Sequence, residues 1–280
     1  MPTIAQQLEK LIELKSELVS NLNDKGVEAS PSEMFNTLIP KVLDIQGGSS
    51  GGTDIMQLKL DTTKNADFLF FSYTGDDVSF LSSLDFSNVT SMQNMFYSCK
   101  KITSIPKMNT QNVTNTYRMF YYCSNLKEVT NEHINTQNVT NVSSMFDNCT
   151  NLITIGPLDF GKATTIGTFL NNCNNIENLT LLNIKRSLTI GYSTTSGTKL
   201  TLESLINTCK ECIKHSSTFK LTIGPTNMEK LSNVYVKFKD PSQTSIATDQ
   251  KGEVEVCEST DAGAMLISNY MTLKNWSLVA

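Results

Sequence analysis

Residues 88–99 read NVTSMQNMFYSC, and the chain returns to nearly the same phrase three more times. The copies are NVTNTYRMFYYC at 112–123, NVTNVSSMFDNC at 138–149 and, more weakly, KATTIGTFLNNC at 162–173. Their final cysteines are separated by 24, 26 and 24 residues. A repeat of this size indicates units that stack on one another, because one unit alone holds too few apolar residues to form a core.

Apolar residues recur at fixed places in each copy. In the first three copies a valine stands near the start, a Met-Phe pair follows, and a cysteine ends the phrase; the fourth copy has Ala163, then Phe169 and Leu170, and ends in Cys173. We therefore expect each of these positions to stack on its counterpart in the next unit, with the cysteines as buried, reduced thiols. The predicted core of the first three copies is Val89, Met95, Phe96, Cys99, Val113, Met119, Phe120, Cys123, Val139, Met145, Phe146 and Cys149.

Each unit is expected to contain a short helix and a strand. Apolar residues between Met92 and Cys99 are spaced by three, one and three, which is one face of a helix of about two turns. Thr90 precedes this segment, where its hydroxyl can cap the first turn. An alternating apolar run follows from Ile102 and predicts a strand. A helix and a strand at this period predict an α/β repeat fold, a leucine-rich-repeat solenoid.

A family resemblance rests on the phrase LDFSNVTSMQNMFYSCKKITSIP at 84–106. It resembles the repeat of the BspA-type leucine-rich-repeat family of surface proteins, over residues 80–182 and more weakly to 280. The resemblance implies four repeats at 84–181, preceded by an N-terminal cap at 54–83. Residues 182–280 would then form an irregular repeat and a C-terminal cap.

The C-terminal hundred residues carry their own element patterns. Thr201 is positioned to cap a helix over 202–213, and alternating apolar residues at 234–238 and 253–256 predict a hairpin. Asp261 is expected to cap a further helix, and a final strand is expected from Trp276. These elements would cover the open end of the repeat array.

The N-terminal residues 1–46 predict a helical anchor. Its first helix has a coiled-coil spacing of apolar residues, and a capping box at 30–33 starts a second helix, so that a helical hairpin is expected. A Gly/Ser linker at 47–53 separates this anchor from the repeats. The coiled coil predicts a homo-oligomer, with a trimer as the favoured state. The residues expected to form its seam are Ile4, Leu8, Leu11, Leu18 and Leu22.

The stretch LVSNLNDKGVEASPSEMFNTLIPKVLDI at 18–45 is similar to N-terminal segments of tail-fibre and baseplate-associated proteins of phages that infect Gram-positive bacteria. The resemblance implies binding to other tail or baseplate proteins and a place in the virion tail. The absence of a signal peptide, membrane span or sorting motif in the sequence favours such a particle over a protein of the bacterial cell surface. A host-encoded BspA-family adhesion protein and a structural tail spacer without a receptor stay open as alternatives.

Composition and motifs narrow the function class. A net charge of −4 and an 18% share of charged residues give no basic surface for nucleic acid, and no segment is apolar enough for membrane insertion. Cys209, Cys212 and His215 resemble half of a zinc site, but core packing is the favoured interpretation because further ligands are scarce. Without paired carboxylates, a nucleophile motif or a phosphate loop, the sequence predicts no enzyme and no cofactor.

The expected function is recognition of a bacterial cell-surface glycan or protein through side chains that differ between the repeats. Tyrosine offers contact area together with a hydroxyl, and amides hydrogen-bond to both kinds of ligand. The alternative is that these side chains only cover the repeat helices. The candidate ligand-binding residues are Tyr97, Tyr117, Tyr121, Tyr122 and Asn148.

Overall fold

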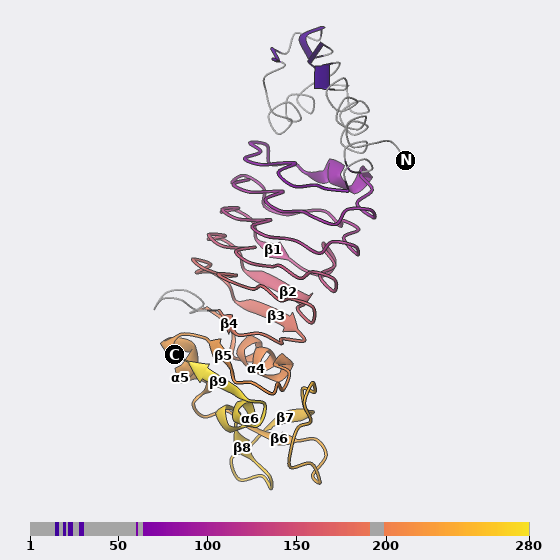
Figure 1. The fold of residues 1–280 in the computed structure, drawn as a ribbon. Coiled ribbons are helices and arrows are strands. Elements are labelled where there is room, and N and C mark those ends of the chain that lie inside the picture. The colour runs from indigo at the N-terminus through magenta and orange to yellow at the C-terminus, as the bar shows by residue number, and fades with distance from the viewer. Residues whose placement is uncertain are drawn as a thin grey trace.

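The computed structural model describes residues 64–190 and 199–279, together with residues 15–16, 19–20, 22–24, 28–30 and 60. Figure 1 shows residues 64–190 as a tall stack of flattened turns, and residues 199–279 as the part that closes its C-terminal end.

The predicted leucine-rich-repeat solenoid is wrong. Residues 64–181, all described, contain no α-helix, and the only helical element among them is the short 3₁₀-helix η1, Ser79–Ser83. The strands of the described residues form three small separate sheets of three strands each, in place of one strand from every repeat. The first repeat has no strand after Ile102.

Tight turns replace the predicted helices. They form five layers, each of nine residues, and isolated parallel bridges join the first residues of consecutive layers. The layers are residues 65–73, 91–99, 115–123, 141–149 and 165–173. Residues 65–73, expected to belong to an N-terminal cap, thus form a layer like those of the repeats, with their own bridge to Ser91.

The hydrogen bonds of a layer explain why no helix forms. The N–H groups of Met92 and Phe96 donate to the carbonyls of Asn115 and Met119 in the next layer, each at 2.9 Å. The N–H of Asn94 does the same, to the carbonyl of Tyr117 at 2.9 Å, whereas Met95 donates locally to the carbonyl of Met92 at 3.2 Å. Backbone donors therefore alternate between a tight turn and the neighbouring layer, which leaves none for the i→i−4 pattern of a helix.

Left-handed backbone angles complete this pattern and explain why the spacing of the apolar residues wrongly predicted a helix. Asn94 and Ser98 have φ values of 55° and 62°, and Arg118 and Tyr122 have 52° and 60° at the same places of the next unit. A single left-handed residue ends an α-helical turn, so each layer is a row of separate turns. Such a row also brings residues spaced by three and one to the same side.

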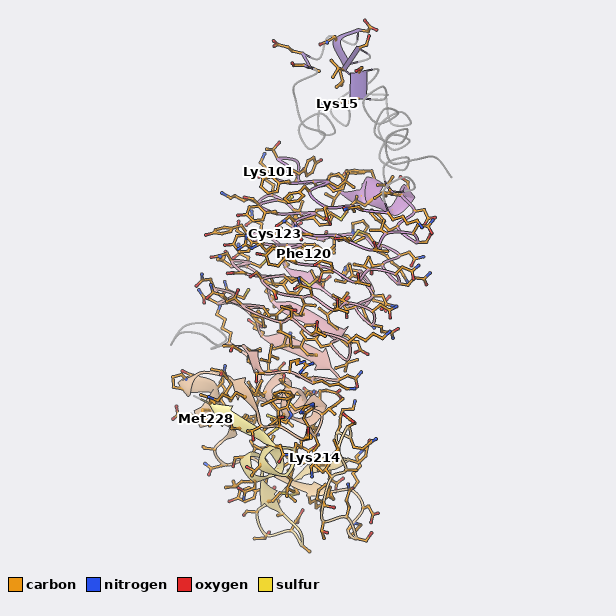
Figure 2. The ribbon with its side chains drawn as sticks, in the orientation of Figure 1. Lys15, Lys101, Phe120, Cys123, Lys214 and Met228 are labelled. Carbon is orange, nitrogen blue, oxygen red and sulfur yellow. The ribbon has the colours of Figure 1, made fainter. Side chains whose placement is uncertain are left out.

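The core of the stack is a column of phenylalanine rings. Phe96 and Phe120 stack with ring centroids 5.4 Å apart, and Phe120 and Phe146 with centroids 5.5 Å apart, both pairs within 3° of parallel. Figure 2 labels Phe120 and Cys123 at the level of one layer within the stack. The twelve core residues expected from the repeats are each at most 1% exposed.

The column of cysteines lines the same core, and all four thiols are free. Each Sγ donates a hydrogen bond to the carbonyl of a phenylalanine in the preceding layer, for example Cys99 to Phe70 at 2.9 Å and Cys173 to Phe146 at 2.8 Å. The thiols therefore fill space and also satisfy backbone acceptors between layers.

Because of this burial, we expect the stability of the fold to fall at alkaline pH. Burial raises the pKa of the Cys173 thiol from 9.0 to about 12, so above pH 9 the folded chain keeps a proton that the unfolded chain releases. The stabilisation is complete below pH 9 and is lost as pH rises toward 12, by about 1.4 kcal/mol between pH 8 and pH 10. Denaturant unfolding under reducing conditions measures it.

Cys173→Ser is the matched control for this effect, because a serine hydroxyl can donate the same hydrogen bond and does not titrate in this range. The variant should lose about 1.4 kcal/mol less than the wild type between these pH values. Equal losses in the two chains would contradict the buried-thiol explanation.

The extended side of the stack carries the parallel sheet β1–β2–β3, whose strands are Glu128–Val129, Thr154–Asp159 and Asn178–Leu182. Pro157 lies at a register shift between Ile155 and Leu158, where β2 needs no ladder donor.

The C-terminal part is a mixed cap with several of the expected elements. The helix α4 spans Leu202–Glu211, and the hydroxyl oxygen of Thr201 accepts a hydrogen bond from the N–H of Ser204 at 3.2 Å, which confirms the predicted cap. The helix α5 spans Pro225–Leu231. The second sheet has the order β4–β5–β9, formed by Leu188–Thr189, Phe219–Thr222 and Trp276–Val279.

The third sheet confirms the predicted hairpin. Its strands β6, Tyr235–Phe238, and β7, Val254–Cys257, pair antiparallel, with β8, Met265–Leu266, on the other side of β6. The predicted role of Asp261 as a helix cap is wrong, because α6 spans Ile267–Leu273 with Leu266 as its N-cap. Asp261 instead pairs with Lys237, Oδ2 to Nζ, at 3.0 Å.

No coiled-coil hairpin is seen among the described residues of the predicted anchor. Residues 15–16, 19–20 and 22–24 are helical, and Leu22 is buried. Ile4, Leu8, Leu11 and Leu18 lie outside the described residues, as does the Gly/Ser linker.

Candidate binding face

A row of aromatic side chains lies on the turn side of the stack, one residue after the buried phenylalanines. Phe71 and Tyr97 stack with ring centroids 4.7 Å apart and planes 10° apart. Tyr97 and Tyr121 continue the row at 4.9 Å and 22°, and Tyr122 meets Tyr121 edge-on at 4.8 Å. Phe68 lies against Phe71 with centroids 5.8 Å apart. The stacked layers thus place aromatic rings from three units side by side.

Arg118 lies within this row. Its guanidinium carbon is 5.0 Å from the ring centroid of Tyr117 and 4.9 Å from that of Tyr121. A guanidinium held over two electron-rich rings is attracted to both, which restricts its rotamers. We call the following set the aromatic face: Phe68, Phe71, Tyr97, Tyr117, Arg118, Tyr121 and Tyr122.

The row ends at a buried carboxylate in the next layer. Asp147 occupies the position that follows Tyr121 in the column, and its Oδ1 accepts hydrogen bonds from Nδ2 of Asn148 at 2.8 Å and of Asn171 at 3.1 Å. Burial raises the pKa of Asp147, while the Asn171 hydrogen bond and the charge of Arg118 lower it. Burial also raises the pKa of Tyr121, to which the charge of Asp147 adds.

The structure brings all five predicted ligand-binding residues to this region. Tyr97, Tyr117, Tyr121 and Tyr122 belong to the aromatic face. Asn148 follows Tyr122 in the same column, but its amide is engaged inside the protein, because it bonds to Asp147 and accepts from Asn172 at 2.9 Å.

Sequence reasoning missed Phe68, Phe71 and Arg118. Aligning NADFLFFSY at 65–73 with SMQNMFYSC at 91–99 would have placed Phe71 in the same column as Tyr97. Arg118 gave no signal of its own, since a single arginine in a polar repeat is indistinguishable from a solvated charge until its neighbours are known.

Comparison with known proteins finds a family match for part of the chain. Residues 64–181 match a family model described as "Mycoplasma protein of unknown function, DUF285". It is a BspA-like family. No curated protein and no solved structure matches the chain. The BspA-like match begins at residue 64, and so includes the first layer, 65–73, that supplies Phe68 and Phe71. It also covers the whole aromatic face.

Two grooves lie outside the aromatic face. One, of about 340 Å³, runs across the units beside β2 and is lined by Asn125, Lys127, Asn151, Ile153 and others. Its amides bond to one another, as Nδ2 of Asn151 does to Oδ1 of Asn125 at 3.1 Å. The other, of about 650 Å³, lies on the third sheet, where an ion pair between Lys237 and Asp261 spans part of its lining. Neither groove combines aromatic contact area with an unpaired charge.

The described residues show no metal centre and no membrane-spanning helix. No three His, Cys, Asp or Glu side chains among them gather closely enough to hold a metal ion. Cys209, in α4, and Cys212, its C-cap, are buried in the core, and burial raises the pKa of both thiols. No described helix of the chain combines the length and apolar character that crossing a bilayer requires.

Proposed function

We propose that this protein is a non-enzymatic binding protein that recognises a ligand on a bacterial surface through its aromatic face. The observation that carries the proposal is a row of rings and one arginine held at fixed spacing by the stacked layers. Aromatic and arginine side chains supply most hot spots of binding interfaces. Two rings, Phe68 and Tyr122, are 46% and 41% exposed. The match to BspA-like proteins supports a surface-associated protein.

We propose further that the protein belongs to the tail of a phage or of a prophage-derived particle, as a tail-fibre or baseplate-associated receptor-binding protein. The support is the resemblance of residues 18–45 to N-terminal segments of such proteins, followed by the Gly/Ser run at 47–53. In this proposal the N-terminal segment joins the protein to other tail proteins and to copies of itself. The BspA-like match favours, as a second candidate, a host-encoded surface protein that uses the same face.

Truncation of the exposed rings tests the binding function. We expect the double variant Phe68→Ala/Tyr122→Ala to bind envelope fractions from Gram-positive bacteria about 30-fold more weakly than the wild type, because hot-spot truncations cost about 2 kcal/mol. Surface plasmon resonance with the full chain in solution and immobilised envelope fractions measures the change. Circular dichroism checks that the fold is kept, which we expect because neither side chain belongs to the buried core.

Val256→Ala is the matched control, because Val256 is 54% exposed but lies on β7, away from the aromatic face. It should bind as the wild type does. Unchanged binding of the double variant would reject the aromatic face as the binding surface. If the wild-type chain bound no envelope fraction, the surface-ligand proposal itself would be lost.

A further inference from the structure

Two buried polar atoms of the described residues have no hydrogen-bond partner, and their residues lie in adjacent layers. They are Nε of Arg118 and Oγ of Ser143. The backbone N–H of Arg118 donates to the carbonyl of Ser143 at 3.1 Å, so the two residues are neighbours across the layer contact. A buried donor without an acceptor costs about 1–3 kcal/mol, so its presence needs an explanation.

The guanidinium of Arg118 is also unpaired. Within the described part of the chain it forms no ion pair, and its side chain donates no hydrogen bond. Asp147 is the acidic side chain whose charge acts on it, but the Oδ1 of Asp147 is occupied by Asn148 and Asn171. Arg118 is thus held between Tyr117 and Tyr121, and no described side chain or carbonyl accepts a hydrogen bond from its guanidinium.

We infer that the guanidinium of Arg118 forms the anchor point of the aromatic face for a carboxylate, supplied by an acidic side chain of a protein ligand. The inference rests on the proposed function and names the chemistry of its ligand. An arginine fork matches a carboxylate in two parallel hydrogen bonds, and restraint by the rings reduces the entropy lost on binding. The outer N–H groups of the fork meet the carboxylate, and the Nε–H group of Arg118 and the Ser143 hydroxyl, which have no partner in the free protein, are the buried polar groups of the same region.

The ring geometry favours a protein over a glycan as the source of this carboxylate. A sugar packs on the open face of an aromatic ring, but Tyr97 lies between Phe71 and Tyr121 in the stack. Tyr121 is further contacted by the Arg118 guanidinium. The middle of the row therefore presents ring edges and hydroxyls. Tyrosine, phenylalanine and arginine side chains grouped in this way are typical of the centre of protein interfaces.

Short synthetic peptides provide the probe. One peptide carries a glutamate flanked by two phenylalanines, and its matched partner carries glutamine in place of the glutamate. We expect the full-length wild-type chain to bind the glutamate peptide about tenfold more tightly, because a hydrogen-bonded charge contributes about 1.5–3 kcal/mol. Arg118→Gln should abolish this preference, and Arg118→Lys should keep only part of it, because lysine has the charge without the fork. Isothermal titration calorimetry measures each affinity.

A ¹⁵N-edited NMR spectrum gives a readout that a purely structural role would not change. The Nε–H resonance of Arg118 should shift on addition of the glutamate peptide and stay in place with the glutamine peptide. A methyl glucuronoside and glycerol phosphate serve as comparison anions, and tighter binding of either one would overturn the assignment to a protein carboxylate.

The outcomes separate this inference from the proposed function. If Phe68→Ala/Tyr122→Ala lost envelope binding while Arg118→Gln kept both envelope binding and the peptide preference, the face would stand as the binding surface and the carboxylate anchor would be refuted. Equal affinity of the wild type for the two peptides would also refute the anchor. Loss of envelope binding in both variants, together with the expected peptide preference, would support both proposals.

Discussion

Phe120→Ala is expected to lower the free energy of unfolding by about 3–5 kcal/mol, the range for removing a fully buried phenylalanine. The ring of Phe120 is stacked between Phe96 and Phe146 and has no exposed surface. Its removal leaves a cavity that touches three layers, and the hydrogen bonds between layers prevent them from closing it. Domain stabilities are commonly 5–15 kcal/mol, so this one change removes a large part of the total. Denaturant titration followed by circular dichroism measures the loss.

Phe68→Ala is the matched control for Phe120→Ala. It makes the same chemical change in the first layer at a ring that is 46% exposed, and we expect it to lose less than about 1 kcal/mol. Because each layer contacts only its neighbours, Phe120→Ala should also raise hydrogen exchange most in the layers next to it. Equal losses in the two variants would show that the phenylalanine column does not stabilise the stack.

The repeat core illustrates what the sequence could predict. The columns that contain Met95, Phe96 and Cys99 could be predicted because equivalent side chains stack on one another. A stacked column has to be apolar in every unit. The hairpin of β6 and β7 could be predicted for a similar reason, since the alternation of apolar and polar residues reports which face of a strand is buried. Both features depend on burial, and the positions of apolar residues along the sequence report burial directly.

The backbone path between the buried positions was not predictable in the same way. A spacing of three, one and three fits a helix and also fits a row of turns, and the choice depends on where the backbone donors go. In this protein Met92 and Phe96 donate to the next layer, a partner about a full repeat away in the chain. Helical periodicity reports side-chain direction only, so it cannot distinguish a local acceptor from a distant one.

Some residues of the candidate site could likewise be predicted from the sequence, and others could not. Tyr97 and Tyr121 could be proposed because they are aromatic residues outside the core columns. The unpaired donors of Arg118 and Ser143 could not, because a missing partner is a property of the assembled layers. Function in a stacked array thus depends on how side chains of different units meet, which one repeat read alone does not contain.

Lys274→Ala is the second change expected to have a large effect, with a loss of about 3 kcal/mol in the free energy of unfolding. Lys274 is fully buried, and its Nζ donates to the carbonyls of Cys209 and Lys210 at 3.1 and 2.8 Å. These carbonyls belong to the last turn of α4, which a cation stabilises, and Nζ also lies 4.3 Å from the ring centroid of Tyr270. Alanine leaves both a cavity and two acceptors without donors. Denaturant unfolding measures the loss.

The pH dependence of stability distinguishes the charge of Lys274 from its packing. Burial lowers the pKa of Lys274 to about 8 from 10.5, so between these values the unfolded chain binds the additional proton. The contribution of Lys274 to stability therefore rises with pH across this window, by about 3 kcal/mol, and opposes the fall caused by the buried thiols. Lys274→Met keeps the apolar stem and removes the titrating amine, and buried thiols titrate in both chains. Between pH 7.5 and pH 10.5 the free energy of unfolding of the wild type should therefore rise relative to that of Lys274→Met. A constant difference between the two chains over this range would show that the pKa of Lys274 is not lowered in the fold.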